Sequence, residues 1–480
     1  MAWETIIGME IHVELATKSK IFCSCPTTFG APPNSQTCPV CLGLPGTLPV
    51  LNDEVVKLAI KAGLALNCDI NLSSKMDRKN YFYPDSPKAY QISQYDLPIC
   101  SGGRIEIEVE GKKKEIRINR IHIEEDAGKL IHMVEEPHSL IDYNRVGVPL
   151  IEIVSEADMR SPQEAVEYVK TLKSILEYAG ISDCRMEQGS LRCDANISIR
   201  RVGQEELNSK VEIKNMNSFK ELIKAMEKEE KRQRELYSFG EGHKVIQETR
   251  RWDSGKGRTV SMRTKEDAHD YRYFPEPDIP TIHFNRNLVE SIEKMIPELP
   301  EAKKKRFKDF YQLTDKEIEI LIGDKPLAEF YERTVKVGAE PKIVANWILG
   351  DLLKLLKVEE LQGSEIPIKE KDLVELLKLI ETGEISGKIA KEVFETMFKT
   401  REEPKSIIAK RGLTQISGEE QLERYILEVL ENNPQSVEDY HGGKKQAMGY
   451  LMGQIMKATQ GQANPQLTKE ILTMKLQNLK

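Results

Sequence analysis

The sequence of 480 residues has no long apolar run. No stretch approaches the roughly 20 apolar residues that a membrane-spanning helix requires, so we expect no insertion into a membrane. The first twenty residues contain Glu4, Glu10 and Glu14, which a secretory signal peptide would not carry. We therefore expect a cytoplasmic protein.

Several catalytic motifs are also missing. The nearest approach to a Walker motif is Gly383, Gly387 and Lys388, but its gap is one residue short, and Ile389 replaces the Ser or Thr that would hold magnesium. We find no Rossmann glycine pattern, no nucleophile elbow and no convincing Cys–His pair for glutamine hydrolysis. If the reaction needs ammonia, another chain must produce it.

The composition is that of a soluble globular protein, with 39% apolar residues, 31% charged residues and a formal net charge of −7. The acidic total gives no indication of nucleic-acid binding, so any such surface must be local. From residue 440 onwards six lysines stand against one acidic residue, Glu470; these lysines are Lys444, Lys445, Lys457, Lys469, Lys475 and Lys480. This local excess favours an RNA-binding tail, and the alternative is an ordinary solvated basic tail.

Apolar residues alternate with potential metal ligands in several short segments. In Ile6–Leu15 the polar face carries Glu10, His12 and Glu14, which is the period of a half-buried strand. Other segments repeat the pattern, with His122 and Glu124 on one face and Glu125 on the other, then Glu152, then Arg192, Asp194, Asn196 and Ser198, then Glu212 and Lys214. We expect these strands to line one sheet face with acid.

Clustered carboxylates repel one another unless a cation lies among them. Magnesium prefers oxygen ligands and usually also contacts phosphate oxygens. The pattern therefore predicts a magnesium site that holds a nucleotide or a phosphorylated intermediate. The alternative is an antiparallel sheet with a solvated outer face.

Four of the eight cysteines form two close pairs, Cys23 with Cys25 and Cys38 with Cys41. Cysteines without a signal sequence favour a reducing compartment rather than a disulfide framework. Two thiolate pairs fit a tetrahedral zinc site, and four sulfur ligands would make that zinc structural. The alternative is free thiols or a redox pair, but no nearby base would activate a thiolate.

The segment 76–96 is rich in Tyr, Asp, Lys and Pro and has little periodicity. Such an ordered loop often carries function, and Lys79, Tyr81 and Lys88 could line a polar passage or meet a substrate. The alternative is a loop merely pinned by its tyrosines. Residues 247–280 also look irregular, and their arginines favour contact with phosphate or RNA.

The composition changes after Pro297, where glycine becomes sparse and strand alternation stops. We predict an α+β chain with an antiparallel-sheet domain over 1–296. An all-α domain should follow over 297–403, and a helical tail domain over 404–480, with a linker at 401–406.

The sequence resembles the B subunits of aspartyl/glutamyl-tRNA amidotransferases. The resemblance rests on GMEIHVEL, DRKNYFYPDSPKAYQISQYD, IHIEEDAGK, PLIEIVSEADMRSP, GSLRCDANISIR, IKNMNSF, DYRYFPEPD and MGQIMKATQGQANPQ. It implies a glutamine-synthetase-like cradle and a tail that binds the tRNA. It also implies a heterotrimer with an amidase A subunit, which releases ammonia, and a small C subunit. Some members of the family lack the zinc cysteines, which are all present here.

In such an enzyme, ATP phosphorylates the side chain of mischarged Asp-tRNA(Asn) or Glu-tRNA(Gln), and ammonia then displaces phosphate. The strand pattern and the resemblance agree on a magnesium site. The candidates for magnesium and catalysis are Glu10, His12, Glu124 or Glu125, Glu152 and Asp194. The candidates for nucleotide binding are Asn196, Ser198, Lys214 and Asn215. Those for ammonia passage are Lys79, Tyr81 and Lys88. The main alternative is a zinc-stabilised RNA-binding scaffold without its own chemistry; a free-standing glutamine-synthetase-like ligase is disfavoured by the tail.

Overall fold

The computed structural model describes the chain except for residues 1, 134–136, 265–270, 414–418, 460–461 and 479–480. The chain divides into two compact units, Met1–Pro300 and Glu301–Lys480. The first unit is built on β-sheet and the second is helical, which confirms the α+β class. The finer domain limits expected at 296 and 403 stay predictions.

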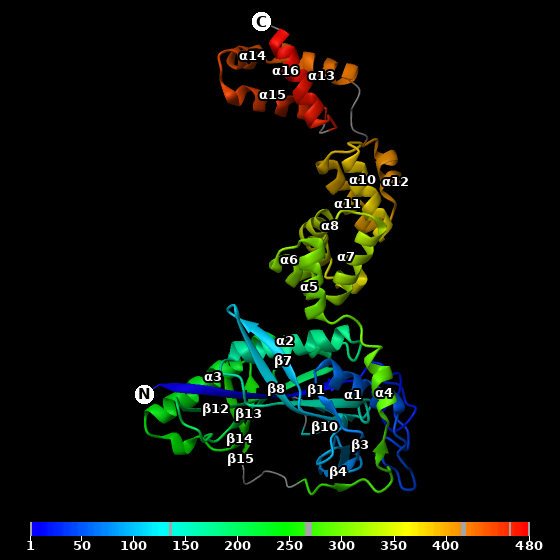
Figure 1. Cartoon of the computed structure of the whole chain (residues 1–480), viewed down its shortest axis with the longest axis vertical. Helices are drawn as coiled ribbons and strands as arrows, with labels where there is room; N and C mark the ends of the chain where they lie inside the picture. The colour runs from blue at the N-terminus through cyan, green and yellow to red at the C-terminus, as the bar shows by residue number, and fades with distance from the viewer. Residues whose placement is uncertain (1, 134–136, 265–270, 414–418, 460–461, 479–480) are drawn as a thin grey trace. The chain divides into compact units, whose positions relative to one another are not determined.

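One ten-stranded, largely antiparallel sheet dominates the first unit (Figure 1). Its spatial order is β15 (Arg258–Thr264), β14 (Glu248–Asp253), β13 (Val211–Lys214), β12 (Leu191–Arg201), β1 (Trp3–Glu14), β11 (Pro149–Ser155), β8 (Lys112–Glu125), β6 (Cys100–Ser101) and β2 (Asp69–Ile70), with β7 (Arg104–Val109) paired to β8. The pair of β13 and β14 is parallel.

The apolar face of β1 is fully buried, as its alternation predicts. Ile7, Ile11 and Val13 are 0% exposed in the hydrophobic core, where each buried isoleucine contributes roughly 1.5–3 kcal/mol. The helices that share this core are α1 (Asp53–Ala65), α2 (Pro162–Tyr178), α3 (Phe219–Ser238) and α4 (Arg286–Glu293). The apolar residues of β1 therefore face helices, and its acidic residues point the other way.

Hydrogen bonds from backbone amides to side chains fix the starts of these helices. Asn52 caps α1 by accepting from the Glu54 amide, and Ser161 caps α2 by accepting from the Glu164 amide. Both caps follow from the sequence, since these residue types accept from amides that the first helical turn leaves unpaired.

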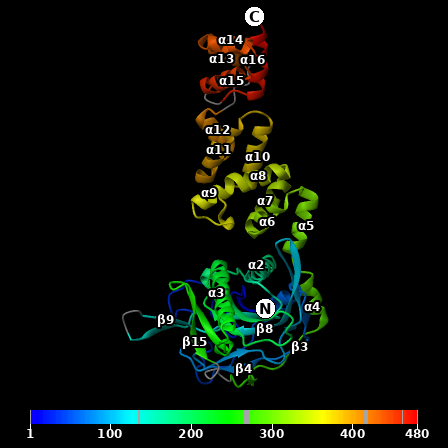
Figure 2. The same ribbon diagram turned by 90° about the vertical axis from the view of Figure 1, so that its left-hand side faces the viewer.

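A small three-stranded sheet, β16 (Phe274–Pro275), β4 (Asp77–Asn80) and β5 (Tyr90–Ser93), packs near the acidic face of the large sheet. Figures 1 and 2 show α2 and α3 on one side of the large sheet and β4 on the other. Two further strand pairs are β9 (Lys129–His132) with β10 (Ser139–Asp142), and β3 (Ser73–Ser74) with β17 (Ile282–His283). The loop 76–96 thus contributes short strands that cover the acid-bearing side.

Residues 247–280 were wrongly expected to be irregular throughout, since β14 and β15 form a hairpin there. Gly257 lies in the turn of this hairpin and has φ +59°. Arg250 is used inside the protein, with Nη1 2.7 Å from Glu248 Oε1 and Nε 3.4 Å from Glu229 Oε2. This arginine is therefore not available for phosphate, and residues 265–270 of the segment lie outside the described part of the chain.

The second unit is helical throughout its described residues. Its helices are α5 (Pro300–Tyr311), α6 (Asp315–Ile322), α7 (Lys325–Val337), α8 (Pro341–Trp347), α9 (Leu353–Val358), α10 (Glu370–Glu381), α11 (Gly387–Thr400), α12 (Pro404–Arg411), α13 (Glu419–Asn432), α14 (Pro434–His441), α15 (Lys445–Ala458) and α16 (Pro465–Asn478). The segment expected as a linker, 401–406, runs into α12, which packs on α10 and α11. Across the parts of both units that are described, no helix combines the length and apolar character needed to cross a bilayer.

The last four helices share a separate apolar cluster that includes Leu422, Leu451 and Leu472. Two of the basic residues noted in the sequence are paired within this segment. Lys444 Nζ lies 2.8 Å from Asp439 Oδ1, and Lys475 is paired with Glu423. Lys457 and Lys469 are exposed, whereas Lys480 and the side chain of Lys445 lie outside what the structure describes.

Candidate metal centres

Strand register brings four polar side chains into one row across the large sheet. Glu152 of β11 is the pairing partner of His122 on β8 and of His12 on β1, and His12 in turn pairs with Arg192 on β12. Residues directly opposite one another on a sheet project to the same face. The acid face that the alternation predicts therefore exists, and Glu152 lies at its centre.

Two imidazoles enclose the Glu152 carboxylate. Oε2 of Glu152 lies 3.3 Å from His12 Nε2 and 3.4 Å from His122 Nε2. Burial alone would raise the pKa of Glu152, but the neighbouring histidines hold this pKa well below its usual range. Burial lowers the pKa of His12, whereas the hydrogen bond and charge of Glu152 raise this pKa by more, so the net shift is upward. The structure thus favours an ionised Glu152.

Glu124 completes the group and is supported from the loop side. It is 3% exposed, and its Oε2 lies 3.2 Å from Lys79 Nζ on β4 and accepts a hydrogen bond of 2.7 Å from Ser93 Oγ on β5. Burial would raise the pKa of Glu124, but the Lys79 charge leads the effects that lower it, and the net shift is downward. The small sheet therefore supplies the positive charge that keeps this buried carboxylate ionised.

The three side chains of His12, Glu124 and Glu152 fit a divalent cation, because each offers a ligand atom and these atoms lie within 4.8 Å of one another. Two carboxylates suit magnesium, and the imidazole nitrogen makes the set acceptable to manganese as well. Beside them, buried His122 Nδ1 has no hydrogen-bond partner among the described residues, which is uncommon for a buried polar atom. The magnesium assignment itself stays a prediction.

Glu10 and Asp194 lie on the same face but outside this group. Glu10 accepts a hydrogen bond of 2.8 Å from Asn196 Nδ2. Burial, followed by the charges of Glu152 and Glu212, raises the pKa of Glu10. Asp194 is the pairing partner of Glu10, and its Oδ2 lies 2.7 Å from Lys214 Nζ.

The residues expected to bind nucleotide flank this second pair of acids. Asn196 and Lys214 hold Glu10 and Asp194, as described above. Ser198, also on β12, is 4% exposed, and Asn215 follows β13 with φ +64°, in the left-handed region. Their direct contact with nucleotide stays a prediction.

Glu125 does not join the acid group, because successive side chains of β8 point to opposite faces. Its carboxylate instead pairs with Lys88 and accepts a hydrogen bond of 2.7 Å from the Ile92 amide. The two lysines expected to line the ammonia passage therefore pair with different carboxylates, Lys79 with Glu124 and Lys88 with Glu125. Tyr81 stacks on Tyr83, with ring centroids 5.6 Å apart.

Two kinds of residue were missed among the site candidates. His122 was noted on the face of Glu124 but was not chosen as a candidate. It lies two residues before Glu124 on the same strand, and this spacing already indicated that both side chains project towards Glu152. Ser93 and Gln91 could not be found, because they come from a loop without periodicity. Gln91 Nε2 donates to Glu124 Oε1 at 3.3 Å.

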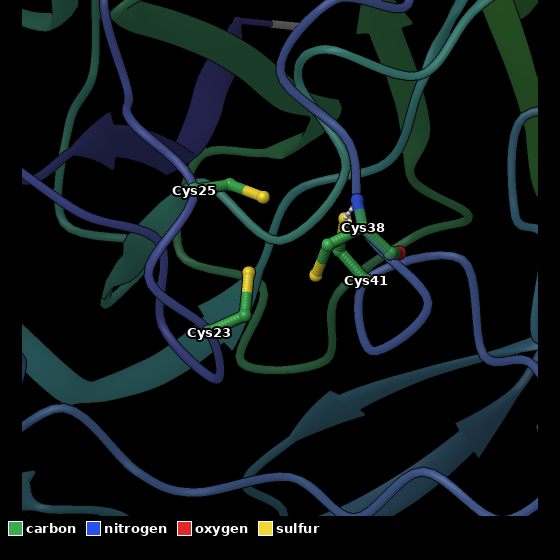
Figure 3. A group of neighbouring side chains, drawn as sticks. All are labelled: Cys23, Cys25, Cys38 and Cys41. Carbon is green, nitrogen blue, oxygen red and sulfur yellow. Dashed lines mark hydrogen bonds between the residues drawn. The ribbon is translucent and has the colours of Figure 1, made fainter.

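The second candidate centre is the cysteine cluster in the loop after β1 (Figure 3). Thiols of Cys23, Cys25, Cys38 and Cys41 offer sulfur atoms that lie within 4.8 Å of one another. The Cys38 amide donates to Cys41 Sγ at 3.2 Å. Four convergent sulfurs are the donor set of a structural zinc site, so the residues present fit this metal.

Buried groups around the cluster favour a thiolate at Cys41. A hydrogen bond from Cys23, followed by other contacts, lowers the pKa of Cys41 to about 5, whereas burial raises the pKa of Cys25 to about 11. Lys20 is 0% exposed, and its Nζ donates to the Gln36 carbonyl at 2.7 Å and lies 3.7 Å from Cys41 Sγ. A buried ammonium beside anionic sulfur offsets part of the charge that a tetrathiolate site carries.

Family models and curated proteins match the chain over nearly all of its length. Residues 5–290 match the model described as the GatB/GatE catalytic domain, and residues 329–476 match the model described as the GatB domain. A B subunit of the aspartyl/glutamyl-tRNA(Asn/Gln) amidotransferase of Clostridium acetobutylicum, the one numbered 2, is 63% identical over 472 residues, 98% of this chain and 99% of the relative. The corresponding B subunit of Clostridium beijerinckii is 59% identical over 479 residues, 100% of both chains. That of Thermoanaerobacter pseudethanolicus is 56% identical over 476 residues, 99% of this chain and 100% of the relative.

Proposed function

The chain belongs to the GatB/GatE family, and we propose that it is the subunit of the tRNA-dependent amidotransferase in which the amide is formed. Its substrates are Asp-tRNA(Asn) and Glu-tRNA(Gln), and its products are the corresponding Asn and Gln forms. The observation that carries this proposal is the group of His12, Glu124 and Glu152, built across neighbouring strands of one sheet.

The reaction proceeds in two steps. An oxygen of the substrate carboxylate attacks the γ-phosphorus of ATP, so that ADP leaves and an acyl phosphate forms. Ammonia then attacks the acyl carbon, the bond from that carbon to the phosphate-bearing oxygen breaks, and phosphate leaves as the nitrogen loses a proton. The first step is needed because a free carboxylate is a poor electrophile.

His12, Glu124 and Glu152 are the residues that would hold Mg²⁺. When bound, the ion neutralises negative charge on the transferring phosphoryl group. Lys79 keeps Glu124 ionised, and His122 orients Glu152 from the side opposite His12. Glu10 and Asp194 extend the acidic face towards Asn196, Ser198, Lys214 and Asn215, which we assign to the nucleotide.

The remaining assignments follow the same division of the chain. The four cysteines hold a structural zinc, Lys79, Tyr81 and Lys88 line the route of ammonia, and the last helices bind tRNA. The amide nitrogen comes from an amidase A subunit, and a small C subunit completes a heterotrimer in the cytoplasm. A scaffold that only binds RNA would not need buried carboxylates and histidines converging on one point of a sheet.

The test is tRNA-dependent ATP hydrolysis by the assembled complex carrying Glu152→Gln or Glu10→Gln. We expect hydrolysis to fall by at least about 100-fold, the scale on which loss of one charge-stabilising group acts. Binding of tRNA should change little. Glu156→Gln is the matched control, because Glu156 follows the same strand but its Oε1 accepts from Asn119 at 2.8 Å, outside the acid group. Full turnover in the Glu152→Gln variant would contradict the metal assignment, and full turnover in the Glu10→Gln variant would show that the outer pair of acids is not needed for the reaction.

A further inference from the structure

Lys88 lies between the cysteine loop and the acidic strand β8. Its side chain is 10% exposed, and its ammonium pairs with Glu125. The ammonium also lies 5.8 Å from the centroid of the Phe22 ring and 5.3 Å from that of Tyr90. Phe22 immediately precedes Cys23, so one wall around Lys88 is attached directly to a thiol of the candidate zinc site.

Gly43 forms a second wall, and it leaves no room for a side chain. A Cβ placed on Gly43 would lie 2.2 Å from Cγ of Lys88 and 3.1 Å from its Cδ. Gly43 follows Cys41 by two residues and has φ +64°, so the turn that carries Cys38 and Cys41 lies directly on the aliphatic part of Lys88. Because the clash is at Cγ, the whole outer part of the lysine would have to move.

Gly147 lies beside both the cysteine loop and Glu125, the partner of Lys88. A Cβ placed on Gly147 would lie 3.7 Å from Cβ of Cys41 and 3.9 Å from Oε2 of Glu125, so both residues border this glycine. The Gly147 carbonyl accepts from the Ile21 amide at 2.9 Å. The cysteine loop thus contacts Lys88 through Phe22 and Gly43, and Gly147 connects this loop with Glu125.

We propose that the cysteine knuckle around Gly43 is a positioning element that holds Lys88 on Glu125. It thereby keeps the ammonia route aligned with the adjacent residue Glu124 of the acid group. The contacts themselves do not depend on any reaction; the role given to Lys88 in guiding ammonia rests on the proposed function. The zinc site then has a task beyond stabilising its own loop, because it fixes the backbone that presses on Lys88.

The test compares Gly43→Ala with Gly46→Ala in the assembled complex. Both glycines have positive φ in the same loop, +64° at Gly43 and +88° at Gly46, so alanine is strained at either position. No described atom lies within 4 Å of a Cβ at Gly46, so only Gly43→Ala also clashes with Lys88. The structural readout is hydrogen exchange of the Ile92 amide, which donates to Glu125 Oε1 at 2.7 Å. We expect at least 10-fold faster exchange in Gly43→Ala than in Gly46→Ala, with equal zinc content in both.

The functional readout is the amide formed per ATP consumed. We expect it to fall in Gly43→Ala while tRNA-dependent ATP hydrolysis is retained. On a Lys88→Ala background, Gly43→Ala should add little further effect, because two changes that act through one contact are not additive. Should Gly43→Ala not fold, Phe22→Leu makes the same comparison from the other wall.

Equal Ile92 exchange in the two glycine variants would overturn the proposal, and so would a full additional loss on the Lys88→Ala background. Faster exchange together with an unchanged ratio of amide to ATP would instead keep the positioning contact and remove the ammonia role of Lys88. The exchange experiment therefore fails or succeeds independently of the proposed reaction.

Discussion

The ammonium of Lys20 lies 3.7 Å from Cys41 Sγ, and both residues are buried. A buried lysine is costly unless an opposite charge or strong acceptors surround it. Here the Gln36 carbonyl supplies one acceptor, and thiolate sulfur supplies the negative charge.

Replacing Lys20 with Met should therefore weaken zinc binding by about 10-fold or more, the usual scale for groups that support metal ligands from outside the ligand shell. The measurement is competition between the protein and a chromophoric zinc chelator. Lys18→Met is the control, because Lys18 lies on the same loop but is exposed. Equal zinc affinity in the two variants would show that Lys20 has no electrostatic role at the cluster.

The helical end of the chain should bind tRNA through exposed lysines. Replacing Lys457 and Lys469 together with Ala should weaken binding and lower the slope of log K against log salt by roughly 1 for each phosphate that is no longer neutralised. The measurement is a filter-binding or fluorescence titration at several salt concentrations. Lys444→Ala is the comparison variant, because the pairing of Lys444 with Asp439 already uses its charge.

Removing residues 414–480 should abolish the whole contribution of the tail to tRNA affinity, while the first unit stays folded. The cut is placed after α12 because this helix packs on α10 and α11. Unchanged affinity in the truncated protein would show that the tail is an ordinary solvated helical segment.

The start of α6 should make the stability of the second unit pH-dependent. Glu317 accepts from the Thr314 amide at 2.8 Å, and its Oε2 lies 2.6 Å from Lys342 Nζ. The hydrogen bond from Lys342, followed by that from the Thr314 amide, lowers the pKa of Glu317 from 4.5 to about 2. The stabilisation is therefore complete above pH 4.5 and is lost as pH falls towards 2.

Glu317→Gln should accordingly lower the thermal unfolding temperature more at pH 7 than at pH 3. Glu319→Gln removes the same charge from the same helix without these partners, and its effect should be smaller at pH 7. The contribution of Glu317 is limited to about 1 kcal/mol, because this cap and ion pair are partly exposed to solvent. A Glu317→Gln effect that is equal at both pH values would contradict the shifted pKa.

The alternation of β1 and β12 was enough to predict which side chains share a face, but not which of them meet. That choice depends on register, since sliding one strand by a single residue would replace Glu152 by an isoleucine opposite His12. The alternation already placed Glu125 on the face opposite Glu124, and in the structure the Glu125 carboxylate pairs with Lys88. The four cysteines could be predicted to converge from the spacing of their two close pairs alone, and their sulfur atoms do lie close together.

The side chains that loops contribute to the site could not be predicted from the periodicity of apolar residues or from the spacing of motifs. Ser93 reaches Glu124 only because β4 and β5 fold over the acidic face, and nothing in the local sequence indicates this approach. The hairpin of β14 and β15 was not predicted, because its strands carry several charged residues in place of a clear apolar alternation. Arg250 pairs with Glu229 and Glu248 inside the protein. Its charge is therefore not available for the phosphate contact that the sequence suggested.

The position of Glu152 between two imidazoles also bears on how the enzyme is assembled. Since His12 and His122 already contact the Glu152 carboxylate from neighbouring strands, we expect the large sheet to fold without a dication. We therefore expect folding of the large sheet and loading of the proposed catalytic ion to be separate events. A chelator that strips this ion should leave the secondary structure unaltered, and adding the ion back should restore turnover without a refolding step.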